Sequence, residues 1–158
     1  MKKIASFTVN HTRLLPGIYV SRKDKIGSEV LTTFDLRFTK PNIDQVLDNG
    51  GIHTLEHLGA TFLRNHQEWQ ERIIYLGPMG CRTGFYLILW GDLVSEDIIP
   101  LLREMADFIL TFQGDIPGVS AEECGNYLEH DLSLAKLYIE NFKKEVLENP
   151  VSERLFYS

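Results

Sequence analysis

The sequence has few cysteines and no long apolar run, and each absence excludes a class of protein. Two cysteines, Cys81 and Cys124, in 158 residues do not make the dense disulfide framework of small secreted domains. No stretch approaches the roughly 18 apolar residues that a membrane span needs, and the N-terminal segment MKKIASFTVNHT lacks the apolar run of a signal peptide. We therefore expect a cytoplasmic protein whose thiols stay reduced and free for metal binding or catalysis.

The chain also lacks a stripe of lysine and arginine, and it has no internal repeats or low-complexity tract. The formal net charge is -6 and 24% of the residues are charged, so the sequence does not favour binding to a nucleic acid backbone. A chain of this length buries roughly two-thirds of its unfolded surface on folding and can form its own core. We expect a single domain over residues 1–158.

The hydrophobic pattern alternates between strand and helix periods. Strands are predicted by alternation or by short apolar runs, and helices by apolar residues at steps of three and four. The predicted strands cover residues 29–38, 71–76 and 84–90, and the predicted helices cover residues 51–67, a segment that begins at Ser95, and 120–147. Because short turns join several strands, the pattern predicts an α+β fold in which helices pack on one face of an antiparallel sheet.

The segment HTLEH within the first predicted helix is the clearest chemical motif. His53 and His57 are one turn apart, so their side chains lie on the same face and can reach one ion together. Glu56 is close to that face and can act as a base without being a ligand. The sequence pattern H-x-x-E-H is a metallopeptidase signature. A simpler interpretation is two histidines and a solvated glutamate on a polar helix face.

A catalytic metal needs a third protein ligand, and Cys124 is the best candidate. Ser120 and Glu123 have the spacing of a capping box, which would place Cys124 in the first turn of a helix. Helix N-termini lower the pKa of a thiol. Two histidines and a cysteine suit zinc or ferrous iron. The alternative is that Cys124 is a core residue, although its neighbours are polar.

Cys81 lies in the glycine-rich turn GPMGCRTG between two predicted strands. Such a turn presents a side chain to solvent rather than burying it. Arg82 and a nearby divalent cation would favour the thiolate. Cys81 is therefore a candidate acid/base or nucleophile.

Together these blocks resemble the LuxS family of S-ribosylhomocysteine lyases, and the resemblance covers nearly the whole chain. No single block is specific, but their order and spacing are. The blocks are Ser6 and Phe7 with His11, FDLRF (34–38) with Pro41 and Asn42, HTLEHL (53–58), RNH (64–66), PMGC (78–81) with RTGFYL, ECGN (123–126) and HDL (130–132).

The resemblance implies a role for each matching residue. It implies that the metal ligands are His53, His57 and Cys124. It implies that Glu56 and Cys81 are the two acid/base residues, and that Ser6, His11 and Arg37 hold substrate. It further implies one divalent metal per subunit, Fe²⁺ with Zn²⁺ or Co²⁺ as substitutes, and a homodimer with its active sites at the interface. Arg37 also has a simpler interpretation as a partner of Asp35, while His66 and His130 receive no role.

The implied reaction opens the sugar of S-ribosylhomocysteine and moves its carbonyl along the chain by proton transfers. β-Elimination then releases homocysteine and leaves 4,5-dihydroxy-2,3-pentanedione, the precursor of autoinducer-2. The chain departs from the family pattern near Gly17, where it carries an extra residue, at Asn10, which replaces a frequent aspartate, and at two further positions. Tyr75 stands where an aspartate is common, and Arg82 replaces a frequent glutamine beside Cys81.

Two other interpretations remain open at the level of the sequence. A pitrilysin-like metallopeptidase would take a glutamate as third ligand, and its candidates are Glu122, Glu123 and Glu129. A structural metal site would need a fourth protein ligand, for which Cys81 is the candidate.

Overall fold

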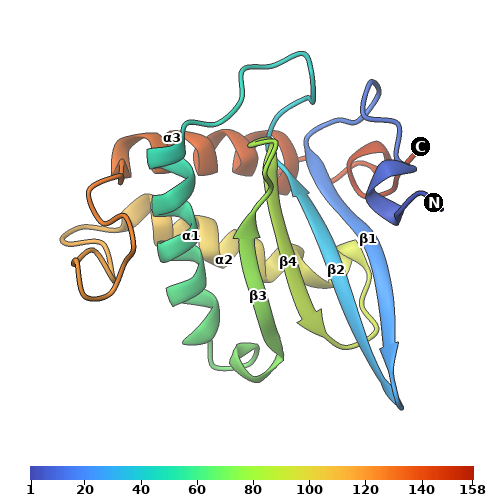
Figure 1. Cartoon of the computed structure of the whole chain (residues 1–158), viewed down its shortest axis with the longest axis horizontal. Helices are drawn as coiled ribbons and strands as arrows, with labels where there is room; N and C mark the ends of the chain where they lie inside the picture. Colours follow the sequence, from blue (N-terminus) through green and yellow to red (C-terminus); the bar gives the residue numbers. More distant parts are fainter.

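The computed structural model describes the whole chain, residues 1–158, and its centre is a four-stranded antiparallel sheet (Figure 1). The strands are β1 (Gly17–Ile26), β2 (Glu29–Arg37), β3 (Ile73–Pro78) and β4 (Gly84–Trp90). They lie side by side in the order β1-β2-β4-β3. Short turns connect β1 to β2 and β3 to β4, as expected for antiparallel neighbours.

Three α-helices cover one face of the sheet (Figure 1). They are α1 (Asn49–Arg64), α2 (Ile99–Thr111) and α3 (Leu132–Phe142). Single helical turns add η1 (Ala5–Phe7), η2 (Gln70–Arg72), η3 (Ser95–Ile98), η4 (Lys143–Leu147) and η5 (Ser152–Arg154). None of these helices combines the length and the apolar character that crossing a bilayer requires. The predicted α+β class, with an antiparallel sheet covered on one face by helices, is confirmed.

The alternation along β4 shows how the sequence separates the two faces of the sheet. Phe85, Leu87 and Leu89 are at most 2% exposed and belong to the core shared with the helices. The intervening Tyr86 and Ile88 are only partly buried and lie on the opposite, open face. A period of two therefore places the core on the helix side.

The alternation of residues 29–38 predicts a half-buried strand with Asp35 and Arg37 on its polar side, but the open face of the sheet is not solvated throughout. Asp35 and Arg37, predicted to lie on the polar side of β2, are each only 2% exposed. Tyr19 of β1 lies opposite Asp35 of β2 in the sheet and is 1% exposed. The two chain ends lie beside this side of the sheet (Figure 1). Burial at this end of the open face therefore comes from the terminal segments.

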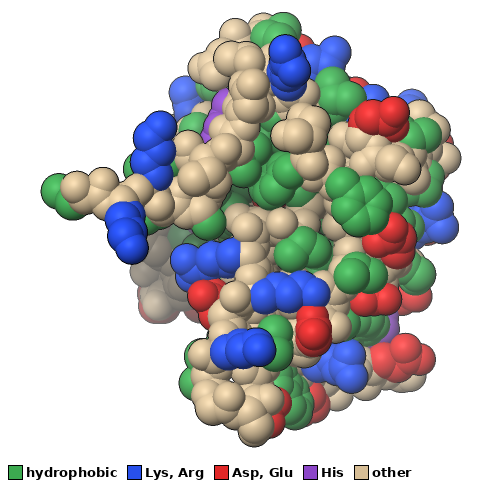
Figure 2. Space-filling view, turned by 90° about the vertical axis from the view of Figure 1, so that its right-hand side faces the viewer, with side chains coloured by type: hydrophobic (Ala, Val, Ile, Leu, Met, Phe, Trp, Pro, Cys, Tyr) green, Lys and Arg blue, Asp and Glu red, His purple; other side chains and the backbone are tan.

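Strand β1 was not predicted, and its composition explains why. It is an edge strand, and its second half carries Arg22, Lys23, Asp24 and Lys25. A bulge between Val20 and Arg22 also interrupts the alternation. Figure 2 shows basic and acidic side chains interspersed on this side of the molecule. Charged side chains on an edge strand oppose pairing with other chains.

The helical segment predicted at Ser95 does begin there, as η3, but its N-cap is Val94, whereas the helix start predicted at Ser120 is wrong. Ser95 does not cap a helix: its buried hydroxyl donates to the carbonyl of Leu155, 3.1 Å away. The segment from Ser120 forms turns, and α3 begins only at Leu132, where the side chain of Asp131 accepts from the N–H of Leu134. The Ser120 hydroxyl instead bonds the Glu123 carboxylate at 2.9 Å.

Candidate functional site

The two histidines of α1 present matching nitrogens to a common point. Nδ1 of His53 lies 2.8 Å from the carbonyl oxygen of Glu129, and Nδ1 of His57 lies 2.7 Å from that of Pro117. Because a carbonyl only accepts, each Nδ1 carries the hydrogen, and each Nε2 has a free lone pair. Metal-binding histidines are commonly held by such outer contacts. Both rings are therefore set for coordination.

A glycine allows the carbonyl of Pro117 to approach His57. Gly118 has a left-handed φ of 73°, which side-chain-bearing residues rarely adopt. A Cβ atom at this position would come within 3.2 Å of His57 Nδ1. The loop that orients His57 therefore depends on a residue without a side chain.

Cys124 completes the set, although not from a helix as predicted. Its Sγ lies 3.3 Å from Nε2 of His53, and the backbone N–H of Asn126 points at the same sulfur from 3.5 Å. The backbone N–H of Cys124 bonds the carbonyl of Ser120 within a turn. The sulfur is therefore approached by one local N–H and by the other cluster residues, and it does not lie at a helix N-terminus.

His130 is a fourth member of the cluster that sequence reasoning missed. One ligand atom from each of His53, His57, Cys124 and His130 lies within 4.8 Å of the others. The His130 ring stacks on that of His53 with centroids 3.8 Å apart. Its Nδ1 is 3.1 Å from the hydroxyl of Thr54, whereas its buried Nε2 has no partner within the chain. Burial, and then the neighbouring histidines, lower the pKa of His130 and favour its neutral form.

This donor set fits a divalent metal. Two imidazoles and a thiol suit zinc or iron, and the unpaired Nε2 of His130 is a buried polar atom that an ion or its bound ligand would satisfy. The carboxylates that a peptidase would need, from Glu122, Glu123 and Glu129, are not part of the cluster.

A second group of predicted residues meets in a separate pocket of about 460 Å³. Ser6, His11, Arg37 and Cys81 all line it, together with Thr83 and other residues. None of the four metal-cluster residues lines this pocket. The structure therefore brings the expected substrate residues together with Cys81, and gathers the expected ligands elsewhere. The structural-metal interpretation named Cys81 as the fourth ligand, but Cys81 is not a member of the cluster.

The thiol of Cys81 faces an arginine, but not the one beside it in sequence. Nη1 of Arg37 lies 3.9 Å from Cys81 Sγ and 2.6 Å from the hydroxyl of Thr83, which is itself 3.1 Å from the sulfur. Arg82, which adopts a left-handed φ of 57°, directs its guanidinium to the carbonyl of Leu47. Arg37, and not Arg82, is thus the arginine whose guanidinium approaches the Cys81 sulfur.

Arg37 also pairs with Asp35, as its simpler interpretation predicted. Its Nε and Nη2 contact the two carboxylate oxygens at 3.1 and 2.6 Å. Burial opposes the charge of Arg37, but the Asp35 carboxylate outweighs it and raises the pKa of the guanidinium. Since this edge of the guanidinium is occupied, Nη1 is the group left to face the pocket.

The remaining predicted positions are placed as follows. Glu56 is half-buried on α1, directly before His57. Tyr75, which departs from the family pattern, is 49% exposed and lines a smaller hollow with Ser6. His66 follows the C-terminal end of α1, and it contacts the carboxylate of Glu104 at 2.9 Å rather than the cluster.

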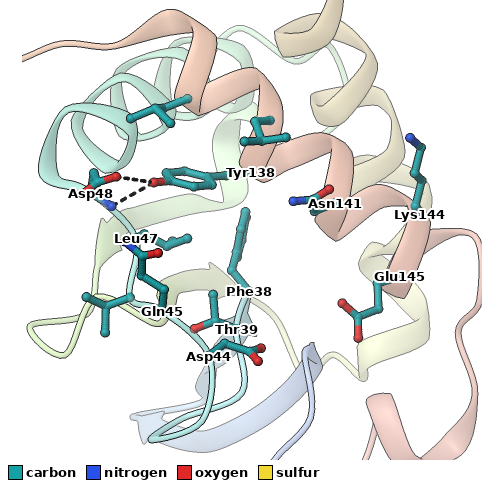
Figure 3. Close-up of a pocket in the computed structure, with 13 residues that line it drawn as sticks. Phe38, Thr39, Asp44, Gln45, Leu47, Asp48, Tyr138, Asn141, Lys144 and Glu145 are labelled. Atoms are coloured by element: carbon teal, nitrogen blue, oxygen red, sulfur yellow. Dashed lines mark hydrogen bonds between the residues drawn. The ribbon is translucent and has the colours of Figure 1, made fainter.

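The largest pocket, about 650 Å³, contains none of the predicted site residues. It lies between the segment 38–48 and α3, and Figure 3 shows Asp44, Lys144 and Glu145 around it. The hydroxyl of Tyr138 bonds the carboxylate and the backbone N–H of Asp48 at one end (Figure 3). Size alone therefore does not locate the chemistry.

Comparison with known proteins gives a consistent result. The family model described as S-Ribosylhomocysteinase (LuxS) matches residues 4–153. The chain is 57% identical over 157 residues to the S-ribosylhomocysteine lyase of Clostridium acetobutylicum, which covers 99% of both chains. It is 54% identical to that of Clostridium beijerinckii, again over 99% of both, and 52% identical to that of Phocaeicola vulgatus, over 99% of this chain and 98% of the relative.

Proposed function

The chain belongs to the S-ribosylhomocysteinase (LuxS) family, and we propose that it cleaves S-ribosylhomocysteine to homocysteine and 4,5-dihydroxy-2,3-pentanedione, the precursor of autoinducer-2. The observation that carries this proposal is full-length similarity together with the intact cluster of His53, His57 and Cys124. The cytoplasm, where free thiols stay reduced, is the compartment that suits such a site.

We propose that Nε2 of His53, Nε2 of His57 and Sγ of Cys124 hold one divalent metal, with Fe²⁺ as the resident ion and Zn²⁺ or Co²⁺ as substitutes. The paired Nδ1 contacts and the mixed imidazole and thiol donors support this assignment. When bound, the metal supplies Lewis-acid stabilisation of the negative charge that develops on the substrate oxygens.

We assign the proton transfers to Glu56 and Cys81. Moving the carbonyl along the sugar requires a proton to leave one carbon and another to reach its neighbour, so two groups on different sides of the substrate serve the reaction. The Glu56 carboxylate adjoins the ligands on α1, and the Cys81 thiol is supported by Arg37. Loss of the C4 proton then expels the homocysteine thiolate from C5. We assign substrate binding to Ser6, His11 and Arg37, which line the same pocket as Cys81.

The separation of the two groups of residues supports a homodimer with shared active sites. The ligand cluster and the Cys81 pocket have no residue in common. Near the pocket, Phe7 of the N-terminal segment is 70% exposed and Tyr75 of the open sheet face is 49% exposed. Large exposed apolar side chains of this kind mark interfaces. We propose that Glu56 and the metal of one subunit face Cys81 of the other.

Shared sites predict complementation between two inactive variants. Subunits carrying His57→Ala and subunits carrying Cys81→Ala are co-expressed with different affinity tags, and the mixed dimer is purified. One of its two sites then receives both changes and the other none, so about half of the wild-type turnover should return. A mixed dimer of His57→Ala and Glu56→Ala subunits is the matched control and should stay inactive. An inactive first pair would place each site within a single subunit.

His130 should contribute to metal affinity without being essential. His130→Ala removes the ring that stacks on His53 and the buried Nε2 beside the ligands, so we expect metal affinity to fall about 10- to 100-fold. Competition with a chromophoric chelator measures this change. If the variant bound metal as tightly as the wild type, His130 would only fill space beside the ligands. If removal of the metal unfolded the protein, a structural metal site would be favoured instead.

A further inference from the structure

The C-terminal tail is fixed against the open face of the sheet. Leu155 is 5% exposed, and its carbonyl accepts from the buried hydroxyl of Ser95. Arg154 donates to the carbonyl of Pro16 at 2.8 Å, next to the start of β1. The ring of Tyr157 then stacks on that of Tyr19, with centroids 4.7 Å apart and planes 12° from parallel. These contacts hold the penultimate residue in one place.

From Tyr157, a continuous set of polar contacts leads to the thiol of Cys81. The Tyr157 hydroxyl donates to Oδ2 of Asp35 at 2.8 Å, and the same oxygen accepts from Nη2 of Arg37 at 2.6 Å. The other end of that guanidinium, Nη1, lies 3.9 Å from Cys81 Sγ. Asp35 and Arg37 are both 2% exposed, so water does not screen the contact between these two side chains.

We propose that Tyr157 is a positioning residue for Cys81, acting through Asp35 and Arg37. Its hydroxyl fixes the Asp35 carboxylate and takes up part of that negative charge, so that Arg37 keeps its orientation and more of its positive charge for the thiolate. The catalytic meaning of this role rests on the proposed function, in which Cys81 transfers protons. The geometry itself does not depend on that function.

The Tyr157 hydroxyl stays protonated and therefore remains a hydrogen-bond donor. Burial, and then the Asp35 carboxylate, raise the pKa of Tyr157 well above its ordinary value, so the hydroxyl keeps its hydrogen at every pH used below. The other titratable groups that line the Cys81 pocket are His11, Asp44 and Tyr86, with Arg37 as the fixed cation. These groups are the same in the proteins compared, so a difference between their pH profiles measures the effect of the Tyr157 hydroxyl.

The test is the pH profile of Cys81 alkylation in the metal-loaded protein. Iodoacetamide reacts with the thiolate, and mass spectrometry of the Cys81 peptide separates its signal from that of Cys124. Rates are measured between about pH 6 and pH 10, which brackets the ordinary thiol pKa. Tyr157→Phe keeps the stacked ring and removes only the hydroxyl. We expect its profile to shift to higher pH, with alkylation near neutral pH about three- to tenfold slower.

A second tyrosine supplies the matched control. Tyr138 also donates its hydroxyl to a carboxylate, that of Asp48 at 3.1 Å, but in the pocket between the segment 38–48 and α3, which contains no predicted site residue (Figure 3). Tyr138→Phe should leave the Cys81 profile unchanged. Removal of Tyr157 and Ser158 together should shift it at least as far as Tyr157→Phe does.

One result would overturn the proposal. If the Tyr157→Phe profile coincided with that of the wild type while the truncated chain melted at lower temperature, the tail would serve packing alone. Because alkylation needs no sugar substrate, the profile is readable even if the chain does not cleave S-ribosylhomocysteine. Failure of the positioning role and failure of the proposed function are therefore separate results.

Discussion

Replacing His57 with alanine is expected to remove both the metal and the turnover. The His57 Nε2 is one of three proposed ligands, and its ring is held by the carbonyl of Pro117. We expect the two remaining proposed ligands, with His130 beside them, to hold the ion too weakly for catalysis, so turnover should fall on the order of 10³-fold or more. Elemental analysis of the purified variant, together with its rate of homocysteine release, measures both effects.

His66 offers a control for this substitution in the same part of the chain. It follows the C-terminal end of α1 and contacts Glu104 rather than the cluster. His66→Ala should keep the full metal content and near-normal turnover. A His57→Ala protein that is both metal-replete and active would contradict the ligand assignment.

Replacing Cys81 with alanine should differ from His57→Ala in one respect. Turnover is again lost, but the metal and the fold remain. Cys81 is exposed and lies outside the ligand cluster, so its removal costs little packing. Loss of a general acid/base group lowers the rate by about 10²- to 10⁴-fold. Glu56→Ala should behave in the same way, since Glu56 is proposed as the second proton-transfer group.

Metal content, melting temperature and homocysteine release, measured on the same preparations, separate these outcomes. Near-normal turnover in either variant would remove that residue from the proton-transfer scheme. Loss of metal from Cys81→Ala would instead place the thiol among the ligands and favour a structural metal site.

The parts of the fold that were predictable have a strong local period. The apolar residues of α1 recur at steps of three and four, and β2 and β4 alternate or run apolar. Strand β1 was missed because its second half carries charged residues, which suit an exposed sheet edge, and lacks the apolar alternation of a strand that packs on a core. The helix predicted from Ser120 was wrong because Ser120 and Glu123 bond each other through their side chains, and the helix cap is Asp131.

The site shows the same division between local and long-range information. His53 and His57 follow from helical spacing, and the pairing of Arg37 with Asp35 follows from their spacing on one strand. His130 was missed because its approach to α1 is set by a turn and by the hydroxyl of Thr54, 76 positions away in sequence. Tyr157 contacts Asp35 across 122 positions, and no local pattern in the tail indicates that contact.

Release of homocysteine from S-ribosylhomocysteine tests the central claim most directly. The protein is purified anaerobically, reconstituted with Fe²⁺ or Co²⁺, and followed with a thiol reagent. The account predicts turnover that disappears on chelation and returns when the metal is restored. Absence of thiol release from folded, metal-replete protein would contradict it, and would point to Tyr75 and the neighbouring pocket as the place where substrate choice has changed.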